Sequence, residues 1–450
     1  MCPGNAGSGE NRIPRKMRNK NMPKAALHTL GCRLNQAETA IIATALKERG
    51  YEIVPFGEKA DLTVINTCTV TEQADAKCRQ AVRQSVRKNP DTFVAVVGCY
   101  AQMAVDTIRE INGVDLIIGN EHKLKLHDFL DENLQKNGQP TIIHSPKISR
   151  EEFVIESIGL YDTHTRANLK IQDGCNFVCS FCIIAKARGP ARSRKFNDIL
   201  DEAKNLVEMG YREIVLTGVN IGTYAQDGHR FLDVLQTLEK IEGLERIRIS
   251  SIEPTTVDRN LIDYMADAEK VCRHLHIPLQ SGDDAILESM RRKHTADDFR
   301  EIVEYAANKI PGIGLGTDIM VGYPTESDRQ FINTKKLVTD LPISYFHVFT
   351  YSDRKGTGSY KLKPKVEHAV KKERARIMLE VGQRKKTAFY QSFIGQTVDV
   401  LFEEQHNGFW EGFSDNYIRV QVESDRDLKN TLRPVTLQRV VQDKIFGELT

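Results

Sequence analysis

Three cysteines in one short segment constrain this chain more than any other feature. Cys175, Cys179 and Cys182 follow the spacing C-x3-C-x2-C. Three thiolates this close together can bind three irons of a [4Fe–4S] cluster and leave the fourth iron open to another ligand. A structural zinc site would need a fourth ligand, and no second cysteine pair follows nearby. The spacing therefore predicts an iron–sulfur cluster, with zinc or unrelated core cysteines as the alternatives.

The composition indicates a multidomain protein of a reducing compartment. A length of 450 residues suits about three domains, and 63 basic against 61 acidic side chains leave the net charge uninformative about partners. Nine cysteines, an odd number, favour metal binding over disulfides, so we expect a cytoplasmic location. No apolar run approaches the roughly 18 residues that a membrane helix needs, so no membrane partner is expected. Residues 1–22, which include Cys2, are polar and basic and predict a disordered tail, with Met22 as an alternative start.

Residues 23–145 alternate between strand and helix patterns. Strands are expected at 25–31, 62–67, 93–98 and 114–119, and helices at 36–49, 72–88, 105–111 and 123–133. This order predicts an open parallel sheet with helices on both faces. Cys32, Cys68 and Cys99 directly follow the first three strands, at the edge where such sheets bind ligands. Their separation matches no general motif, so spacing leaves a second metal site and unrelated thiols equally open. Cys78, inside a predicted helix, is expected to be a packing or partly exposed thiol.

Residues 146–162 are interpreted as a linker, and residues 163–386 as six further strand–helix units. Six units predict a partial (β/α)6 barrel, too few to close like an eight-stranded one. Polar residues again follow the strand ends, where parallel barrels carry their catalytic groups. These candidates are Thr217, Gly218, Asn220, Ser250, Ser251, Glu253, Gln280, Ser281 and Asp318. Each of them alone is as well explained as a helix N-cap. Cys272 begins a strand and is expected to be core.

A basic stretch ends this region. Residues 361–386 contain ten Lys and Arg against three Glu in a largely helical pattern. Solvated helix faces often carry such charge. With an RNA substrate the same side chains would contact phosphates, and the candidates are Lys371, Lys372, Arg374 and Arg376.

Residues 390–450 switch to the strand period. Five short strands in about 55 residues predict a small all-β barrel of the OB type, a common RNA-binding scaffold. Trp410, with Phe409 and Phe413, either stacks a base or packs the core of this barrel.

These segments resemble the radical S-adenosylmethionine (SAM) methylthiotransferase family. The cysteine loop IQDGCNFVCSFCII and the blocks LTGVNIG, RISSIEP, HIPLQSGDDAIL and GTDIMVGYPTE are similar to its central domain, and the last strands to its TRAM domain. The resemblance implies that the open iron binds SAM, with contacts from the LTGVNIG and RISSIEP blocks. GCRLNQAE, INTCTVT and VGCYAQ resemble the three places where the family ligates an auxiliary [4Fe–4S] cluster, so Cys32, Cys68 and Cys99 are implied ligands. Ala185 and Thr325 depart from the usual proline and glycine, and neither is a ligand.

Within the family, the chain looks most like the branch acting on N6-threonylcarbamoyladenosine beside the tRNA anticodon. This resemblance implies methylthiolation of C2 of that base with two SAM molecules and two clusters. It also implies three partners: tRNA, an electron donor such as flavodoxin or ferredoxin, and a sulfur donor. Arg33, beside Cys32, is our candidate for the substrate carboxylate or an adjacent phosphate, because a guanidinium offers a bidentate fork. Alternatives are the branches acting on isopentenyladenosine or a ribosomal-protein aspartate, and a non-catalytic iron–sulfur RNA-binding protein.

Overall fold

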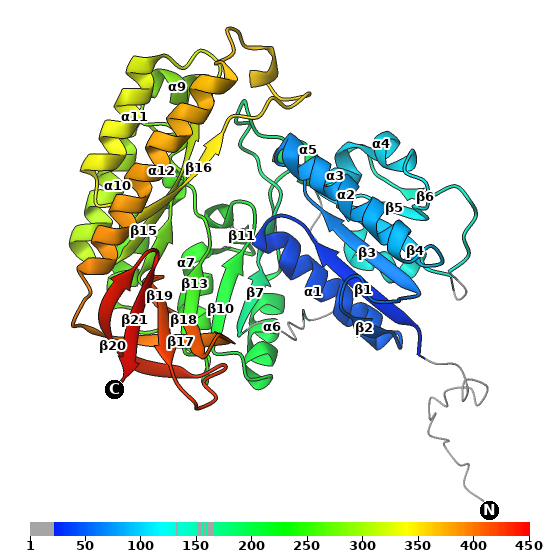
Figure 1. Cartoon of the computed structure of the whole chain (residues 1–450), viewed down its shortest axis with the longest axis horizontal. Helices are drawn as coiled ribbons and strands as arrows, with labels where there is room; N and C mark the ends of the chain where they lie inside the picture. Colours follow the sequence, from blue (N-terminus) through cyan, green and yellow to red (C-terminus); the bar gives the residue numbers. More distant parts are fainter. Residues whose placement is uncertain (1–21, 132–133, 151–154, 156–158, 160–164) are drawn as a thin grey trace, which may run out of the picture.

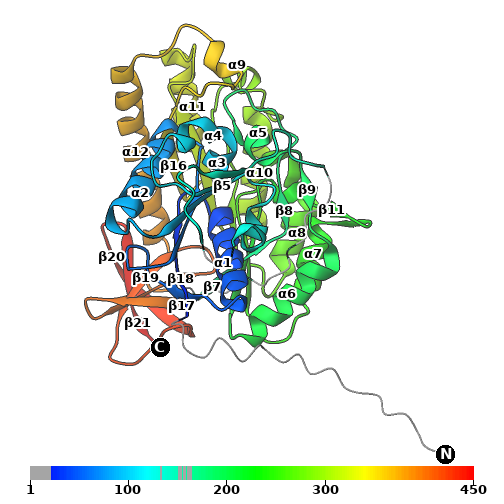
Figure 2. The same cartoon turned by 90° about the vertical axis from the view of Figure 1, so that its right-hand side faces the viewer.

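The computed structural model describes residues 22–131, 134–150, 155, 159 and 165–450. Within them the chain forms a parallel sheet with helices, a partial barrel of parallel strands and a closed barrel that is antiparallel except for its β19–β21 pair (Figures 1 and 2). The fold class predicted from the sequence is therefore confirmed. Almost all of the predicted tail and most of the predicted linker lie outside the described residues. No helix in the described ranges is both long and apolar enough to cross a membrane.

The N-terminal sheet has the order β2-β1-β3-β4-β5-β6, and all its pairs are parallel. Its strands are β1 (Lys24–Thr29), β2 (Glu52–Val54), β3 (Leu62–Thr67), β4 (Phe93–Gly98), β5 (Leu116–Ile118) and β6 (Thr141–Ile143). β3 and β4 are buried along their whole length, because helices cover both faces of the sheet.

The covering helices divide between the two faces. α1 (Arg33–Glu48) and the 3-10 helix η1 (Lys123–Phe129) pack on one face, and α2 (Glu72–Lys88), α3 (Cys99–Met103) and α4 (Val105–Arg109) on the other. α2 begins where predicted, because Thr71 accepts a hydrogen bond from the Ala74 N–H as its N-cap. The predicted helix at 123–133 is corrected to the shorter η1, which is kinked at Lys125.

The central domain contains six parallel strands in two groups of three. They are β7 (Arg166–Lys170), β10 (Glu213–Thr217), β13 (Arg246–Ile249), β14 (His274–His276), β15 (Gly314–Val321) and β16 (Tyr345–Thr350). Parallel bridges from Ile247 to Val271 and from Ser251 to His276 join the groups into one curved sheet with a lumen on its concave side. The partial six-unit barrel is therefore confirmed.

Helices cover the convex side of this sheet. They are α6 (Phe196–Glu208), α7 (Phe231–Leu238), α8 (Arg259–Asp267), α10 (Ala296–Lys309), α11 (Asp328–Asp340) and α12 (His368–Gln391). The sequence pattern at 284–290 continues through 297–308 and predicts one helix, but α9 (Asp284–Ser289) ends first, and α10 starts with a capping box between Thr295 and Asp298. Arg291 between them has a positive φ of 57°, which interrupts the helix.

The C-terminal barrel closes in the order β17-β18-β19-β21-β20. Its strands are β17 (Thr397–His406), β18 (Phe409–Ser414), β19 (Arg419–Glu423), β20 (Leu432–Val441) and β21 (Lys444–Leu449). Trp410 is only 7% exposed and packs in the core of this barrel, so the core alternative holds for that side chain.

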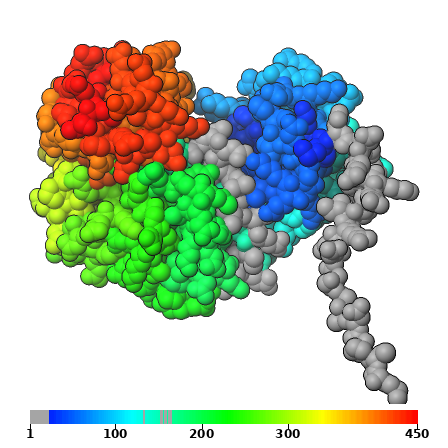
Figure 3. All heavy atoms as spheres, turned by 90° about the horizontal axis from the view of Figure 1, so that it is seen from below, coloured from blue at the N-terminus to red at the C-terminus, as the bar shows by residue number. Residues whose placement is uncertain are grey.

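The C-terminal barrel packs against the strand-start end of the central lumen (Figures 1 and 3). Arg248 donates hydrogen bonds to the carbonyls of Asp415 and Ser414 at 2.8 and 3.1 Å, in the turn between β18 and β19. Gly314 is needed here, because a Cβ at that position would lie 2.2 Å from the Asn416 carbonyl oxygen. The turn thereby places Tyr417 within reach of the lumen.

Candidate active site

The central cysteine loop lies beyond the end of β7. Cys175 follows the short strand β8 (Gln172–Asp173), and Cys182 precedes α5 (Ile184–Arg188). Gly174 allows the turn into the loop: its φ is +71°, and a Cβ there would meet the Pro190 carbonyl oxygen at 1.9 Å.

Each of the three sulfurs faces one N–H donor. The backbone N–H of Phe177 points to Cys175 Sγ at 3.3 Å, and that of Ile184 to Cys182 Sγ at 3.4 Å. Arg292 Nη1 reaches Cys179 Sγ at 3.5 Å. Donors of this kind tune the reduction potential of an iron–sulfur cluster.

The protonation chemistry also suits metal ligation. Burial raises the pKa of the Cys182 thiol to about 12 and raises that of Cys175, and the neighbouring thiols act in the same direction. Such thiols keep their protons at neutral pH unless a metal replaces the proton. Three soft thiol ligands with N–H donors to their sulfurs fit a cluster that takes three protein ligands.

The predicted SAM-contact residues gather beside this loop. Thr217 and Asn220 are 2% exposed at the end of β10. The side-chain oxygen of Gln172 accepts from the N–H groups of Val219 and Asn220 at 2.9 and 2.8 Å, which fixes the turn. Within the described residues, neither amide atom of Asn220 has a hydrogen-bond partner of good geometry, although the amide lies near enough to the Cys175 thiol to oppose the rise in its pKa. A buried amide without partners is costly, and it fits a polar ligand next to Cys175.

The other predicted contacts stand differently. Ser251 is exposed and bridges to His276 through its backbone. Glu253 pairs with Arg292 at 2.5 and 3.2 Å, and Arg292 also donates to the Pro278 carbonyl at 3.0 Å. Sequence reasoning missed Arg292, because it lies in the segment expected to be continuous helix. Its side chain is 3% exposed and connects Glu253 to Cys179.

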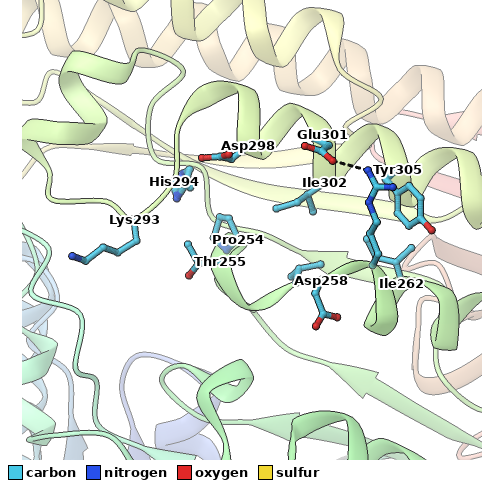
Figure 4. Close-up of a pocket in the computed structure, with 12 residues that line it drawn as sticks. Pro254, Thr255, Asp258, Ile262, Lys293, His294, Asp298, Glu301, Ile302 and Tyr305 are labelled. Carbon is cyan, nitrogen blue, oxygen red and sulfur yellow. Dashed lines mark hydrogen bonds and ion pairs between the residues drawn. The ribbon is translucent and has the colours of Figure 1, made fainter.

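A groove of about 490 Å³ lies on the outer flank of the barrel, between η3 (Pro254–Thr256), α8 and α10 (Figure 4). Burial lowers the pKa of His294 in its wall to about 4, so this imidazole is neutral at physiological pH. Arg259 and Glu301, which also line the groove, pair at 2.7 Å. The lining includes no cysteine, so we place this groove outside the site.

The N-terminal cysteines lie at the carboxyl ends of β1, β3 and β4, which are neighbours in the sheet. Cys32 is exposed, whereas Cys68 and Cys99 are buried. Burial raises the pKa of Cys68 to about 11, and the nearby Cys99 and Cys32 contribute in the same direction. Asn120 donates to Cys99 Sγ at 3.4 Å. The structure therefore gathers the second triad at one sheet edge.

Of the three cysteines without a predicted metal role, Cys2 lies outside the described residues and the other two are core. Cys78 lies beneath Cys68, and its sulfur hydrogen-bonds the Cys68 backbone N–H and carbonyl at 3.4 and 3.2 Å. Cys272 is 1% exposed at the start of β14. The packing alternative holds for Cys78.

Buried charges join the two cysteine-bearing domains. Glu38 of α1 accepts hydrogen bonds from Lys123 at 2.5 Å, Lys170 at 2.7 Å and Arg188 at 2.9 Å. Asp173 pairs with Lys170 at 2.8 Å and with Arg188 at 3.0 Å. None of these five side chains is more than 4% exposed. We call this set the interdomain charge cluster.

The interdomain charge cluster lies close to both cysteine triads along the chain. Asp173 is two residues before Cys175. Asn120 donates both to Cys99 Sγ and, at 2.6 Å, to the Ala187 carbonyl beside Arg188. The charge cluster thus fixes the N-terminal cysteine edge against the central cysteine loop.

The four basic candidates of α12 are used mainly within the fold. Arg374 is 5% exposed and pairs with Glu326 at 2.6 Å and Asp328 at 2.8 Å. Arg376 pairs with two glutamates of its own helix, and Lys371 donates to the Tyr351 carbonyl at 3.3 Å. Lys372 alone among the four has no hydrogen bond or ion pair to the described part of the chain.

Arg33 lies where the three domains meet. Its guanidinium donates to the Tyr417 hydroxyl at 2.5 Å, and its Cζ lies 5.8 Å from the centroid of that ring. The first residue of α1, directly after Cys32, therefore contacts the C-terminal barrel at the lumen.

Comparisons with known proteins agree with this architecture. Residues 169–338 match the model of the Radical SAM superfamily, and residues 24–119 match a family described as Uncharacterized protein family UPF0004. The solved structure of the radical S-adenosylmethionine methyltransferase TsrM from Kitasatospora setae, with cobalamin and a [4Fe-4S] cluster bound, has a TM-score of 0.52 and 15% identity, and the match covers 76% of this chain and 77% of that one. That likeness shows a shared fold.

Named relatives are similar over most of the chain. Threonylcarbamoyladenosine tRNA methylthiotransferase MtaB of Aquifex aeolicus is 38% identical over 91% of this chain and 99% of its own length. The MtaB of Bacillus subtilis is 36% identical over 90% of this chain and 92% of its own length. The tRNA-2-methylthio-N(6)-dimethylallyladenosine synthase of Alkaliphilus oremlandii is 33% identical over 86% and 83%. The chain therefore belongs to the family of radical SAM tRNA methylthiotransferases.

Proposed function

We propose that this protein methylthiolates C2 of N6-threonylcarbamoyladenosine next to the anticodon of tRNA, using two SAM molecules and two [4Fe–4S] clusters. The observation that carries the proposal is the pair of cysteine triads, which the interdomain charge cluster holds together across two domains. Relatives named for this reaction, at 36–38% identity, support this choice of base.

As a radical SAM enzyme the protein uses SAM and an iron–sulfur cluster. In our proposal Cys175, Cys179 and Cys182 hold that cluster, and Cys32, Cys68 and Cys99 hold a second one. When bound, the cluster and SAM supply one-electron chemistry that removes a hydrogen atom from an unactivated C–H bond. The C2–H of adenine needs this, because it is neither acidic nor electrophilic enough for acid–base chemistry at neutral pH.

The surrounding residues would then position the reactants. Asn220, with Thr217 and Gly218 on the same strand end, would bind polar groups of SAM, because its buried amide has no other described partner. Arg292 would hold Glu253, and with it the Ser251 segment, at the edge of Cys179. Arg33 would present a cation on the side of Cys32, facing the carboxylate of the threonylcarbamoyl group.

The partners belong to the same proposal. tRNA would be held through phosphate contacts, of which Lys372 is the candidate on α12. A flavodoxin or ferredoxin would supply electrons, a separate donor would supply sulfur, and the reaction would take place in the cytoplasm.

The test is nucleoside mass spectrometry of tRNA from cells with and without the gene. The 2-methylthio form of threonylcarbamoyladenosine should vanish in the deletion while its precursor accumulates. Loss of 2-methylthio-isopentenyladenosine instead would refute the choice of base and keep the chemistry. No change in either nucleoside would point to the ribosomal-protein substrate.

The division of labour between the triads is tested with purified protein. Cys179→Ala should abolish both SAM cleavage and product. Cys68→Ala should keep 5′-deoxyadenosine formation measurable while the methylthiolated product disappears. Normal product from Cys68→Ala would refute the second cluster.

A further inference from the structure

The lumen of the central domain carries a cluster of side chains that the cysteine chemistry does not use. His276, Asp318 and His347 lie on the neighbouring strands β14, β15 and β16. His276 Nε2 lies 3.0 Å, and His347 Nδ1 3.2 Å, from the same oxygen of Asp318. Because Asp318 and His347 are register partners in adjacent strands, this geometry is built into the sheet.

These hydrogen bonds orient His347. The ring donates to Asp318 through Nδ1, so its Nε2 is the nitrogen left for another partner. The two histidines differ sharply in exposure, at 8% for His276 and 58% for His347. His276 is therefore a buried support, whereas His347 offers a fixed ring and a free nitrogen to the lumen.

Aromatic rings continue along the same strand. Tyr345, His347 and Phe349 alternate along β16 and so share one face. The ring centroids of Tyr345 and His347 lie 5.7 Å apart, and those of His347 and Phe349 6.4 Å. Phe349 is 47% exposed, although an apolar ring this large normally packs in a core. We call these three residues the β16 ring strip.

The β16 ring strip leads into the junction of the three domains. Tyr345 stacks at 6.1 Å on Tyr417 of the C-terminal barrel, and Tyr417 accepts the hydrogen bond of Arg33. Arg33 directly follows Cys32. A planar ligand on the exposed end of the strip would therefore lie in the lumen that all three domains line.

We propose that the β16 ring strip binds the target nucleobase, which stacks on Phe349. His347, whose ring stands at 73° to that of Phe349, hydrogen-bonds through Nε2 the substituent on the exocyclic nitrogen of the purine. This inference rests on the proposed function and adds the residues that read its substrate. Proteins recognise single-stranded RNA loops in this way, by stacking splayed bases on aromatic side chains.

The strip suits a base better than a divalent cation. The ligand atoms of His276, Asp318 and His347 all lie within 4.8 Å of one another, as a metal site requires. However, both imidazoles already direct a nitrogen to one carboxylate oxygen, and the exposed Phe349 beside them has no role in binding a cation. A stacked base accounts for both features.

The experiment measures binding of an anticodon stem-loop RNA, with and without the threonylcarbamoyl group, to the cluster-loaded full chain. The variants are Phe349→Ala and His347→Gln. The matched controls are His406→Gln, whose side chain has the same 58% exposure and also pairs with an acid, and Ile332→Ala, which is 57% exposed on α11. Melting temperature and iron content confirm that each variant is folded and loaded.

We expect Phe349→Ala to weaken binding of both RNAs by about 10- to 100-fold, the range of one lost stacking contact. His347→Gln should remove most of the preference for the modified RNA, and both controls should match the wild type. Since the phosphate contacts lie elsewhere, the salt dependence of binding should be the same in all five proteins.

Two results would overturn the inference alone. The first is wild-type binding and wild-type preference in both strip variants, which would leave the proposed function standing. The second is one Zn²⁺ bound per chain in the wild type and lost in His347→Gln with RNA preference unchanged, which would make the cluster a metal site. If the wild type binds neither RNA, the proposed function and the inference both fail.

Discussion

Replacement of Glu38 by Gln tests the interdomain charge cluster most directly. The substitution keeps the shape of the side chain and removes its charge, which leaves Lys123, Lys170 and Arg188 facing a neutral amide. Burial opposes ionisation of Glu38, but Arg188 and the two lysines lower its pKa well below the usual range, so the carboxylate is charged at neutral pH. The side chain has no exposed surface, so water cannot screen the loss.

The expected effect is large. Removing one partner of a buried ion pair costs about 3–5 kcal/mol, because the remaining charge is left uncompensated. At about 2–4 °C per kcal/mol, the thermal midpoint should fall by roughly 6–20 °C. Scanning calorimetry of matched preparations measures this shift. A second change, Lys123→Met, should restore part of the loss in the Glu38→Gln background, because it removes a buried cation whose carboxylate partner is gone.

The control is Glu301→Gln, the same substitution in a pair of similar length. Glu301 and Arg259 lie 2.7 Å apart, but their side chains are 67% and 66% exposed. Surface pairs contribute little, so the control should melt like the wild type. The reasoning is refuted if Glu38→Gln also melts within a degree of the wild type.

Three further outcomes are expected. Burial raises the pKa of Glu213, but Arg248 acts in the opposite direction and the pKa falls to about 2. The pair should therefore contribute about 3 kcal/mol above pH 4.5, and this contribution should be lost as pH falls towards 2. Urea midpoints measured across that pH range should show the loss, and Glu213→Gln should flatten the pH dependence. Arg374→Ala should lower the melting temperature and leave the salt dependence of tRNA binding unchanged. Lys372→Ala should keep the melting temperature and reduce the slope of log affinity against log salt by about 1. The opposite pattern would reverse the structural role of Arg374 and the phosphate-binding role of Lys372. Asn220→Ala should weaken SAM binding about tenfold in equilibrium dialysis at wild-type iron content, and unchanged binding would remove this residue from the SAM site.

Sequence reasoning located the cysteines because their positions follow from strand ends, which apolar runs mark clearly. Cys68 and Cys99 directly follow two buried strands and Cys32 lies three positions past the end of β1, and parallel pairing brings such ends to one edge. The same reasoning could not find the partners of Glu38. A glutamate on an amphipathic helix is normally solvated, and two of its cations lie 132 and 150 positions away in the chain.

Long-range pairing also explains the different placement of Arg374 and Arg292. Arg374 belongs to a basic segment whose sequence fits a solvated helix and an RNA-binding helix equally well. It is buried because it pairs with Glu326, which lies 48 positions earlier in the chain. Arg292 follows a left-handed residue, Arg291, that is neither glycine nor asparagine. The break that directs Arg292 towards Cys179 is therefore not marked by such a residue, and its local signal is the capping box of Thr295 and Asp298 that starts α10.

The hydrogen bond between Arg33 and Tyr417 joins residues 384 positions apart. During synthesis, the first candidate cluster ligand, Cys32, therefore leaves the ribosome long before Tyr417, the residue that completes the lumen beside it. Domains fold largely in the order of their synthesis, so the N-terminal domain forms before the C-terminal barrel is available to contact it. A nascent or truncated chain would thus carry cysteines without a finished pocket, and the capacity to engage substrate would arise only after the C-terminal barrel has been made.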